Sequence, residues 1–173
     1  DSLDAGLARQ RHFPAINWLN SYSLYPQSLN QWFRDNIASD FPEVRTEISA
    51  LLKVEAELQE IVQLVGSDAL PMDQQLTLEV ARMIRVYFLQ QNGFDPVDAY
   101  SGVEQQYAMA RAILTFQEEA KKAMASGAVL EDVVNVPARI ELMRARFAEG
   151  YLEKIEGLVE EMVSQIGNSE EAQ

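Results

Sequence analysis

The side chains able to do chemistry in this sequence do not assemble into a recognisable catalytic or metal centre. His12 is the only histidine, and no Ser-His-acid or Cys-His combination can be built around it, so it is interpreted as a polar linker residue. The glutamates do not form the Glu-x-x-His pattern of carboxylate metal bundles. Neither a G-x-x-x-x-G-K-S/T phosphate loop nor a G-x-G-x-x-G fingerprint occurs. We therefore expect no catalytic residue and no metal ligand in this chain.

Aromatic side chains near the N-terminus are the residues best suited to binding a planar ligand. They are Phe13, Trp18, Tyr22, Tyr25, Trp32 and Phe33. Periodicity favours a core role for most of them. Phe13 differs, because Pro14 restricts it to extended geometry outside any helix. Phe13 could therefore present its flat face to another domain or to a planar ligand.

A helical hairpin over residues 58–94 is the element around which the rest of the chain is organised. Its first arm carries apolar residues at helical spacing and stops at Gly66, and Pro71 with Asp73 favours the start of a second helix. The apolar positions expected to be buried are Leu58, Ile61, Val62 and Val65 on the first arm and Leu76, Val80, Met83, Ile84 and Tyr87 on the second. A tip at 67–73 would lie roughly 30 Å from an aromatic base at Phe88 and Phe94, which indicates a lever.

The remaining patterns predict an all-α bundle with an extended N-terminal arm. Asp40 with Glu43, and Ser101 with Glu104, have the spacing of capping boxes that open helices. One helical turn or two is expected at 129–135, followed by one long final helix from Pro137 through Ile166. We divide the chain into an extended arm at 1–20, a helical bundle at 21–167 and a frayed acidic tail at 168–173.

Composition restricts the possible partners. The chain has 173 residues, 47% of them hydrophobic and 24% charged, which is typical of a folded globular protein. Its net charge of −13 argues against binding nucleic acid through a basic face. No apolar run is long enough to span a bilayer, and the absence of cysteine fits a reducing, cytoplasmic setting. The sequence begins without methionine, and we expect it to be a piece of a longer protein.

Three segments carry a resemblance to a known family. They are RHFPAINWLNSYSLY at 11–25, ELQEIVQLVGSDALP at 57–71 and FLQQNGFDPVDAY at 88–100. They resemble the C-terminal part of the catalytic A subunit of archaeal A-type and vacuolar V-type rotary ATPases, and the resemblance extends over essentially the whole chain. It implies that a nucleotide-binding domain with the phosphate loop, the catalytic glutamate and the metal ligand lies upstream.

The resemblance also implies roles for particular residues. The segment is more distantly similar to the F-type beta subunit, in which a tyrosine-proline step stacks on adenine, and that aromatic falls on Phe13. A second adenine-pocket aromatic falls on Phe94, with Gly93 in place of the usual alanine. The F-type acidic loop that presses on the rotating stalk aligns with Asp68, Ala69, Leu70, Pro71, Met72 and Asp73. Only two acids remain there, which makes a contact based purely on charge doubtful and gives Leu70 and Met72 more weight.

The implied function is a part of an ion-translocating ATP synthase or ATPase coupled to proton or sodium transport. The full subunit would bind ATP or ADP with Mg, whereas this piece alone would bind no cofactor and have no ATPase activity. Its partners would be the B subunit of the catalytic hexamer and the central stalk, at the cytoplasmic periphery of the membrane without inserting into it. The alternative is a free-standing helical interaction module with no nucleotide role, and a phosphate loop upstream of Asp1 in the parent reading frame would decide between them.

Overall fold

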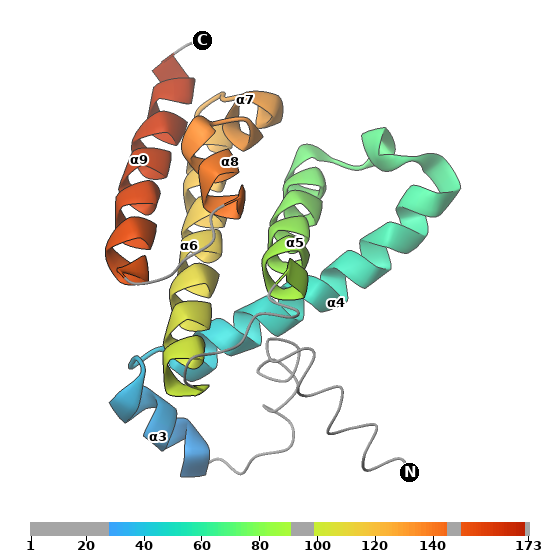
Figure 1. Cartoon of the computed structure of the whole chain (residues 1–173). Helices are drawn as coiled ribbons and strands as arrows, with labels where there is room; N and C mark the ends of the chain where they lie inside the picture. Colours follow the sequence, from blue (N-terminus) through green and yellow to red (C-terminus); the bar gives the residue numbers. More distant parts are fainter. Residues whose placement is uncertain (1–27, 91–98, 145–149, 172–173) are drawn as a thin grey trace.

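The computed structural model describes residues 28–90, 99–144 and 150–171, and all of the regular structure in these ranges is helical. The prediction of an all-α fold is confirmed (Figure 1). The helices are α3 (Ser28–Asn36), α4 (Phe41–Val65), the 3-10 turn η1 (Ser67–Ala69), α5 (Met72–Gln90), α6 (Ala99–Ala125), α7 (Leu130–Val134), α8 (Pro137–Arg144) and α9 (Tyr151–Glu171).

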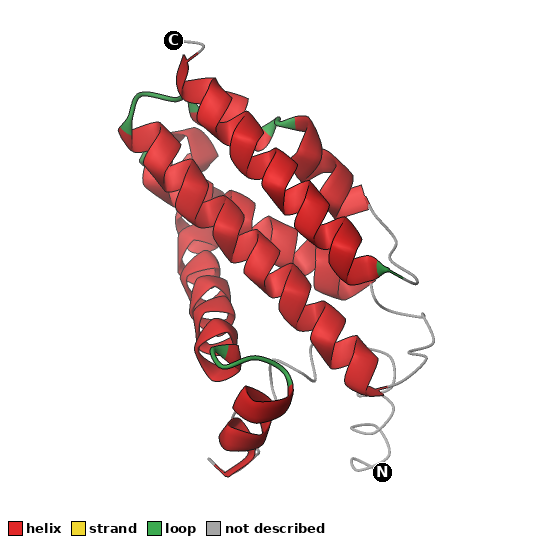
Figure 2. Cartoon of the chain, turned by 90° about the vertical axis from the view of Figure 1, so that its left-hand side faces the viewer, coloured by secondary structure: helices red, strands yellow, loops and turns green. Residues whose placement is uncertain are grey.

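The core lies where the N-terminal half of α4 and helices α5, α6, α8 and α9 meet. The apolar face predicted for α5 is confirmed, since all five of its expected positions are buried. Helix α6 contributes a stripe of buried side chains from Met109 to Ala120, with Met124 partly buried beyond it. Helices α6 and α9 run side by side in the same direction (Figure 2). The bundle therefore has one well-packed body, from which the C-terminal half of α4 projects (Figure 1).

The long final helix predicted from Pro137 through Ile166 is wrong, because this stretch contains the two helices α8 and α9. Gly150 has φ of +75°, a backbone conformation that L side chains rarely adopt, directly before α9 begins. The Ala138 amide donates a hydrogen bond of 2.8 Å to Oε1 of Gln165. In one continuous helix these residues would be roughly 40 Å apart. Helix α8 instead folds back along α9, which buries Leu142 and Met162 in the common core.

The capping box predicted at the start of α4 does not form, because other partners take its groups. The Asp40 side chain makes no cap hydrogen bond to α4 and accepts instead from the Tyr107 hydroxyl, 67 residues further on. Glu43 pairs with Arg34 at 2.6 Å, and this hydrogen bond lowers the pKa of Glu43. Helix α6 begins at Ala99, so Ser101 lies inside the helix rather than before it. The helical turn predicted at 129–135 is present as α7, and Gly127, which has φ of +107°, follows the end of α6.

Candidate functional site: the hairpin tip

The tip begins where Gly66 stops α4. Its φ of +86° and ψ of 157° fall in a region open essentially only to glycine, and its amide still bonds the Val62 carbonyl at 2.8 Å. The predicted stop is confirmed, and the extended ψ differs from the left-handed helical value common at helix C-termini. The chain leaves α4 abruptly at this residue.

The loop from Ser67 to Pro71 is held by its own hydrogen bonds. The Leu70 amide donates to the Ser67 carbonyl at 3.1 Å. The side chain of Gln75 returns from α5 and donates to the Leu70 carbonyl at 2.9 Å. The Pro71 carbonyl accepts from the amides of Gln74 and Gln75, each at 3.0 Å, which starts α5. With these groups paired, the tip has a defined shape rather than an open loop.

The tip residues predicted from the sequence divide into inward-facing and outward-facing ones. Leu70 is only 5% exposed and lies outside the main core cluster, so it anchors the loop within the hairpin. Asp68, Ala69, Pro71 and Asp73 are exposed. Met72 is 54% exposed. Of Leu70 and Met72, the two apolar tip residues expected to contact a rotor, only Met72 is therefore exposed to a partner.

A feature that sequence reasoning missed is an apolar stripe on the outer face of α4. Four large apolar side chains form it, Leu64 being 84% exposed: Val54, Ile61, Leu64 and Val65. At about 100° per residue, Val54, Ile61 and Val65 lie within roughly 40° of one another around the helix, and Leu64 borders them. The expectation that Ile61 and Val65 face the hairpin interior is wrong, whereas Leu58 of the same arm is buried. The 54–61–65 spacing indicates that these side chains share one face of the helix, but it does not say whether that face is covered.

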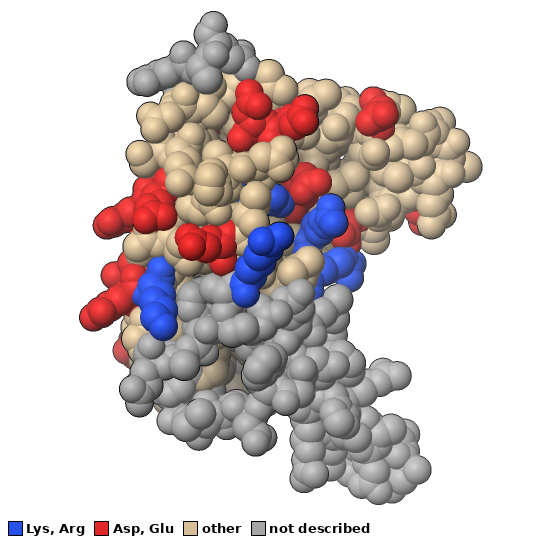
Figure 3. Space-filling model, turned by 45° about the horizontal axis from the view of Figure 1, so that its top comes forward, with Lys and Arg blue, Asp and Glu red and all other residues tan. Residues whose placement is uncertain are grey.

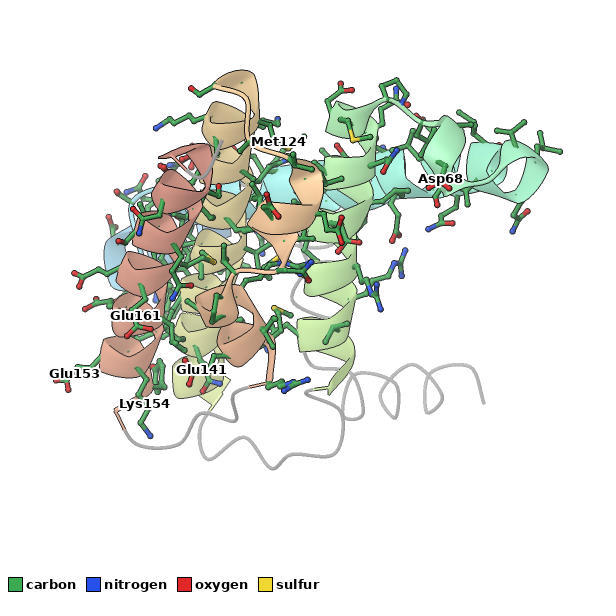
Figure 4. The ribbon with its side chains drawn as sticks, turned by 90° about the horizontal axis from the view of Figure 1, so that it is seen from above. Asp68, Met124, Glu141, Glu153, Lys154 and Glu161 are labelled. Carbon is green, nitrogen blue, oxygen red and sulfur yellow. The ribbon has the colours of Figure 1, made fainter. Side chains whose placement is uncertain are left out.

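The stripe and the tip share a projecting surface, where Glu57 and Glu60 of α4 are exposed as well. Figure 4 shows the end of α4 and η1, with Asp68, standing away from the bundle. In Figure 3 the projection is mostly uncharged, whereas the body carries clusters of acidic and basic side chains. The geometry thus offers a partner exposed apolar side chains, with Glu57, Glu60, Asp68 and Asp73 among and beside them.

An ion pair joins the two arms of the hairpin below the tip. Nε and Nη2 of Arg85 on α5 both approach Oε1 of Glu55 on α4 at 2.5 Å. The Glu55 side chain is only 7% exposed and the Arg85 side chain 50%. The hydrogen bond to Glu55 raises the pKa of Arg85. We call this contact the clamp, because it joins the two arms of the hairpin.

The predicted adenine-pocket residues Phe13, Gly93 and Phe94 lie outside the described residues, as does His12. Within the described ranges, no group of three or more His, Cys, Asp or Glu side chains is placed to hold a metal ion. No helix in those same ranges has the length and hydropathy that crossing a membrane requires.

Comparison with known proteins identifies the family. Residues 30–134 match the model of the C-terminal domain of V and A type ATP synthase. The chain belongs to this family. The match spans the whole hairpin, from α3 through α7, so the projecting tip and the clamp are part of the V/A-type C-terminal domain.

Individual relatives agree with the family model. The chain is 50% identical over 161 residues to the A subunit of the A-type ATP synthase of Methanosarcina barkeri, a match that covers 93% of this chain and 28% of the relative. It is 45% identical over 171 residues to an A subunit of the A-type ATP synthase of Methanospirillum hungatei, covering 99% of this chain and 29% of the relative. The V-type ATP synthase alpha chain 1 of Clostridium tetani is 50% identical over 147 residues, covering 85% and 25%. The chain thus spans between a quarter and a third of the length of these relatives.

Proposed function

We propose that this chain is the C-terminal helical part of a catalytic A subunit in an A/V-type ATP synthase or ATPase. In that enzyme it contacts the central rotor stalk through the hairpin tip and so couples ATP synthesis or hydrolysis to proton or sodium transport. The observation that carries the proposal is the hairpin itself: a hydrogen-bonded tip, projecting from the bundle and carrying apolar side chains outward, in a chain of this family.

The composition of the surface favours a contact that depends on apolar area. Leu64, Val65 and Met72 expose large side chains beside the tip, whereas Asp68 and Asp73 are its only acids. Burying apolar surface yields roughly 25 cal/mol per Å². An exposed charge pair contributes only about 0–1 kcal/mol. The two acids of the tip would therefore contribute little, and the proposal assigns most of the contact energy to apolar area.

The nucleotide role remains part of the same proposal. Phe13, Gly93 and Phe94 would line the adenine side of a site whose phosphate-binding part lies in the upstream domain. ATP or ADP with Mg would bind in the full subunit, next to the B subunit, at the cytoplasmic periphery of the membrane. The helices between that site and the tip would then transmit closure around the nucleotide to the rotor.

The experiment compares two sets of changes in the complete enzyme, reconstituted in vesicles. Leu64→Asn with Val65→Asn removes apolar contact area from an exposed surface, and we expect fewer ions transported per ATP hydrolysed while ATP hydrolysis continues. Asp68→Asn with Asp73→Asn should leave this ratio nearly unchanged. Val129→Asn is the matched control, because Val129 is a similarly exposed apolar residue on the body. Loss of coupling in the Asp pair but not in the Leu64 and Val65 pair would show that the tip acts through charge and would refute the apolar contact, whereas unchanged coupling in both pairs would refute the rotor contact itself.

A further inference from the structure

A second surface, distant from the hairpin tip, has the form of a binding groove. It is about 460 Å³ in volume and lies between α6 and α9. These helices run side by side on the face turned to the viewer in Figure 2. The hairpin tip projects from the opposite side of the molecule (Figure 1). The groove is therefore separate from the surface assigned above to the rotor contact.

The floor of the groove is made of apolar side chains, two of which are the small side chains of alanine. Ala108 and Ala112 lie one turn apart on α6, and Ile155 and Val159 occupy the matching positions on α9. Small residues at i and i+4 leave room for another helix to approach closely along the valley between two packed helices. Leu152, which is exposed, adds apolar surface at one end.

The length of the groove fits a short helix. Its α6 wall runs from Glu104 to Thr115, which corresponds to roughly 16 Å at 1.5 Å per residue. Three turns of α-helix have this length, about eleven residues. The shape thus favours an amphipathic helix lying in the valley with its apolar side down.

The rim of the groove is acidic. Glu156 and Glu160 lie one turn apart on the α9 side, and Glu104 lies on the α6 side. The one basic residue in the lining, Arg111, has Nε 3.9 Å from Oδ2 of Asp40, so its charge is offset within the chain. A partner that brings Lys or Arg to both edges would be complementary to this rim.

We propose that the groove between α6 and α9 docks a basic amphipathic helix of another polypeptide, with its apolar face on the alanine floor and its Lys or Arg side chains against Glu104, Glu156 and Glu160. A second copy of this chain is disfavoured as the occupant, because each copy carries a net charge of −13. The proposal does not depend on the rotor contact.

The test measures binding of a fluorescent synthetic helix of fourteen residues, with Leu at heptad a and d positions and Lys at the flanking positions. The full chain is titrated into the peptide at about 0.15 M salt, where charges more than about 8 Å apart are largely screened. We expect the Lys peptide to bind and an otherwise identical Glu peptide not to bind.

Charge variants separate the groove from general attraction to an acidic protein. Glu156→Lys with Glu160→Lys should weaken binding about tenfold, because two favourable rim contacts become repulsive. Glu141→Lys on α8 with Glu161→Lys on α9 changes the net charge by the same amount, but neither residue lines the groove; Figure 4 labels both. This control should change the affinity less than about twofold. Circular dichroism verifies that both variants keep their helices.

A third variant tests the floor without changing any charge. Ala108→Phe fills the groove and should weaken peptide binding at least about tenfold. The proposal is overturned if the Lys peptide does not bind, if both charge variants weaken it equally, or if Ala108→Phe binds as well as the original chain. Sedimentation equilibrium adds one further measurement, the oligomeric state. If the original chain forms a dimer and Ala108→Phe dissociates it, the occupant of the groove is a second copy, which would also overturn the proposal.

Discussion

Breaking the clamp between Glu55 and Arg85 should lower the free energy of unfolding by different amounts, depending on which of the two residues is changed. The Glu55 side chain is 7% exposed, whereas that of Arg85 is 50% exposed. Arg85→Met removes the cation and leaves a buried carboxylate without its partner. Glu55→Gln leaves a guanidinium that can turn into water, next to an amide that can still accept a hydrogen bond.

The magnitudes follow from these exposures. Leaving an uncompensated buried charge costs about 3–5 kcal/mol, and the half-exposed setting of Arg85 reduces this to roughly 2–3 kcal/mol for Arg85→Met. For Glu55→Gln we expect about 1 kcal/mol, the size of one ordinary net hydrogen bond. The double variant should cost less than the sum of the two, because the second change removes the charge that the first leaves stranded.

The assay is urea unfolding followed by circular dichroism at neutral pH, with the free energy of unfolding extrapolated to water. The same slope in all four proteins is required for the comparison. Equal costs for the two single variants, or a larger cost for Glu55→Gln, would refute the reasoning. The clamp would then act as an ordinary surface ion pair.

Two further predictions concern single positions. Gly66→Ala should destabilise the chain by about 1–3 kcal/mol through backbone strain alone, because an added Cβ meets nothing within 4 Å, whereas Gly157→Ala inside α9 should stabilise it by about 0.5–1 kcal/mol. Urea unfolding of both variants checks this, and a stabilised Gly66→Ala would contradict it. Burial raises the pKa of the Tyr87 phenol far above its usual value near 10. The unfolded chain therefore loses this proton first, and stability should fall as the pH rises above about 10, by up to about 1.4 kcal/mol per pH unit from this group. Tyr87→Phe should make that decline shallower in thermal melts at pH 9–11, and an unchanged slope would exclude Tyr87 as a cause.

The sequence was sufficient to predict which residues are buried where an apolar helix face packs against other helices of the same chain. Leu76, Val80 and Ile84 recur at helical spacing on α5, and the core packs against that face as expected. The glycine stop at Gly66 was equally readable, because only glycine occupies that backbone conformation without strain. The position of the tip between the two arms was therefore predicted correctly, and its contact with a rotor stays a prediction.

The sequence was insufficient where periodicity does not say what covers a face. Ile61 and Val65 have the spacing of a buried stripe, yet they face outward, because α4 extends beyond the bundle. Gly150 lies inside the single final helix that the pattern predicts, although in the structure it precedes a separate helix that packs on α8. The Asp40 cap failed for a related reason: its competitor, Tyr107, is distant in sequence and close only after folding.

The stripe on α4 also bears on how molecules of this chain behave at high concentration. An exposed apolar surface is a site through which copies of the same protein can associate. The net charge of −13 opposes this by mutual repulsion over a range of about 10 Å at 0.1 M salt. At a pH near the isoelectric point of about 4.4 the net charge approaches zero. The repulsion is then lost, and the stripes of two molecules can come into contact. The acidic composition therefore gives the isolated domain colloidal stability that its projecting hairpin would otherwise remove.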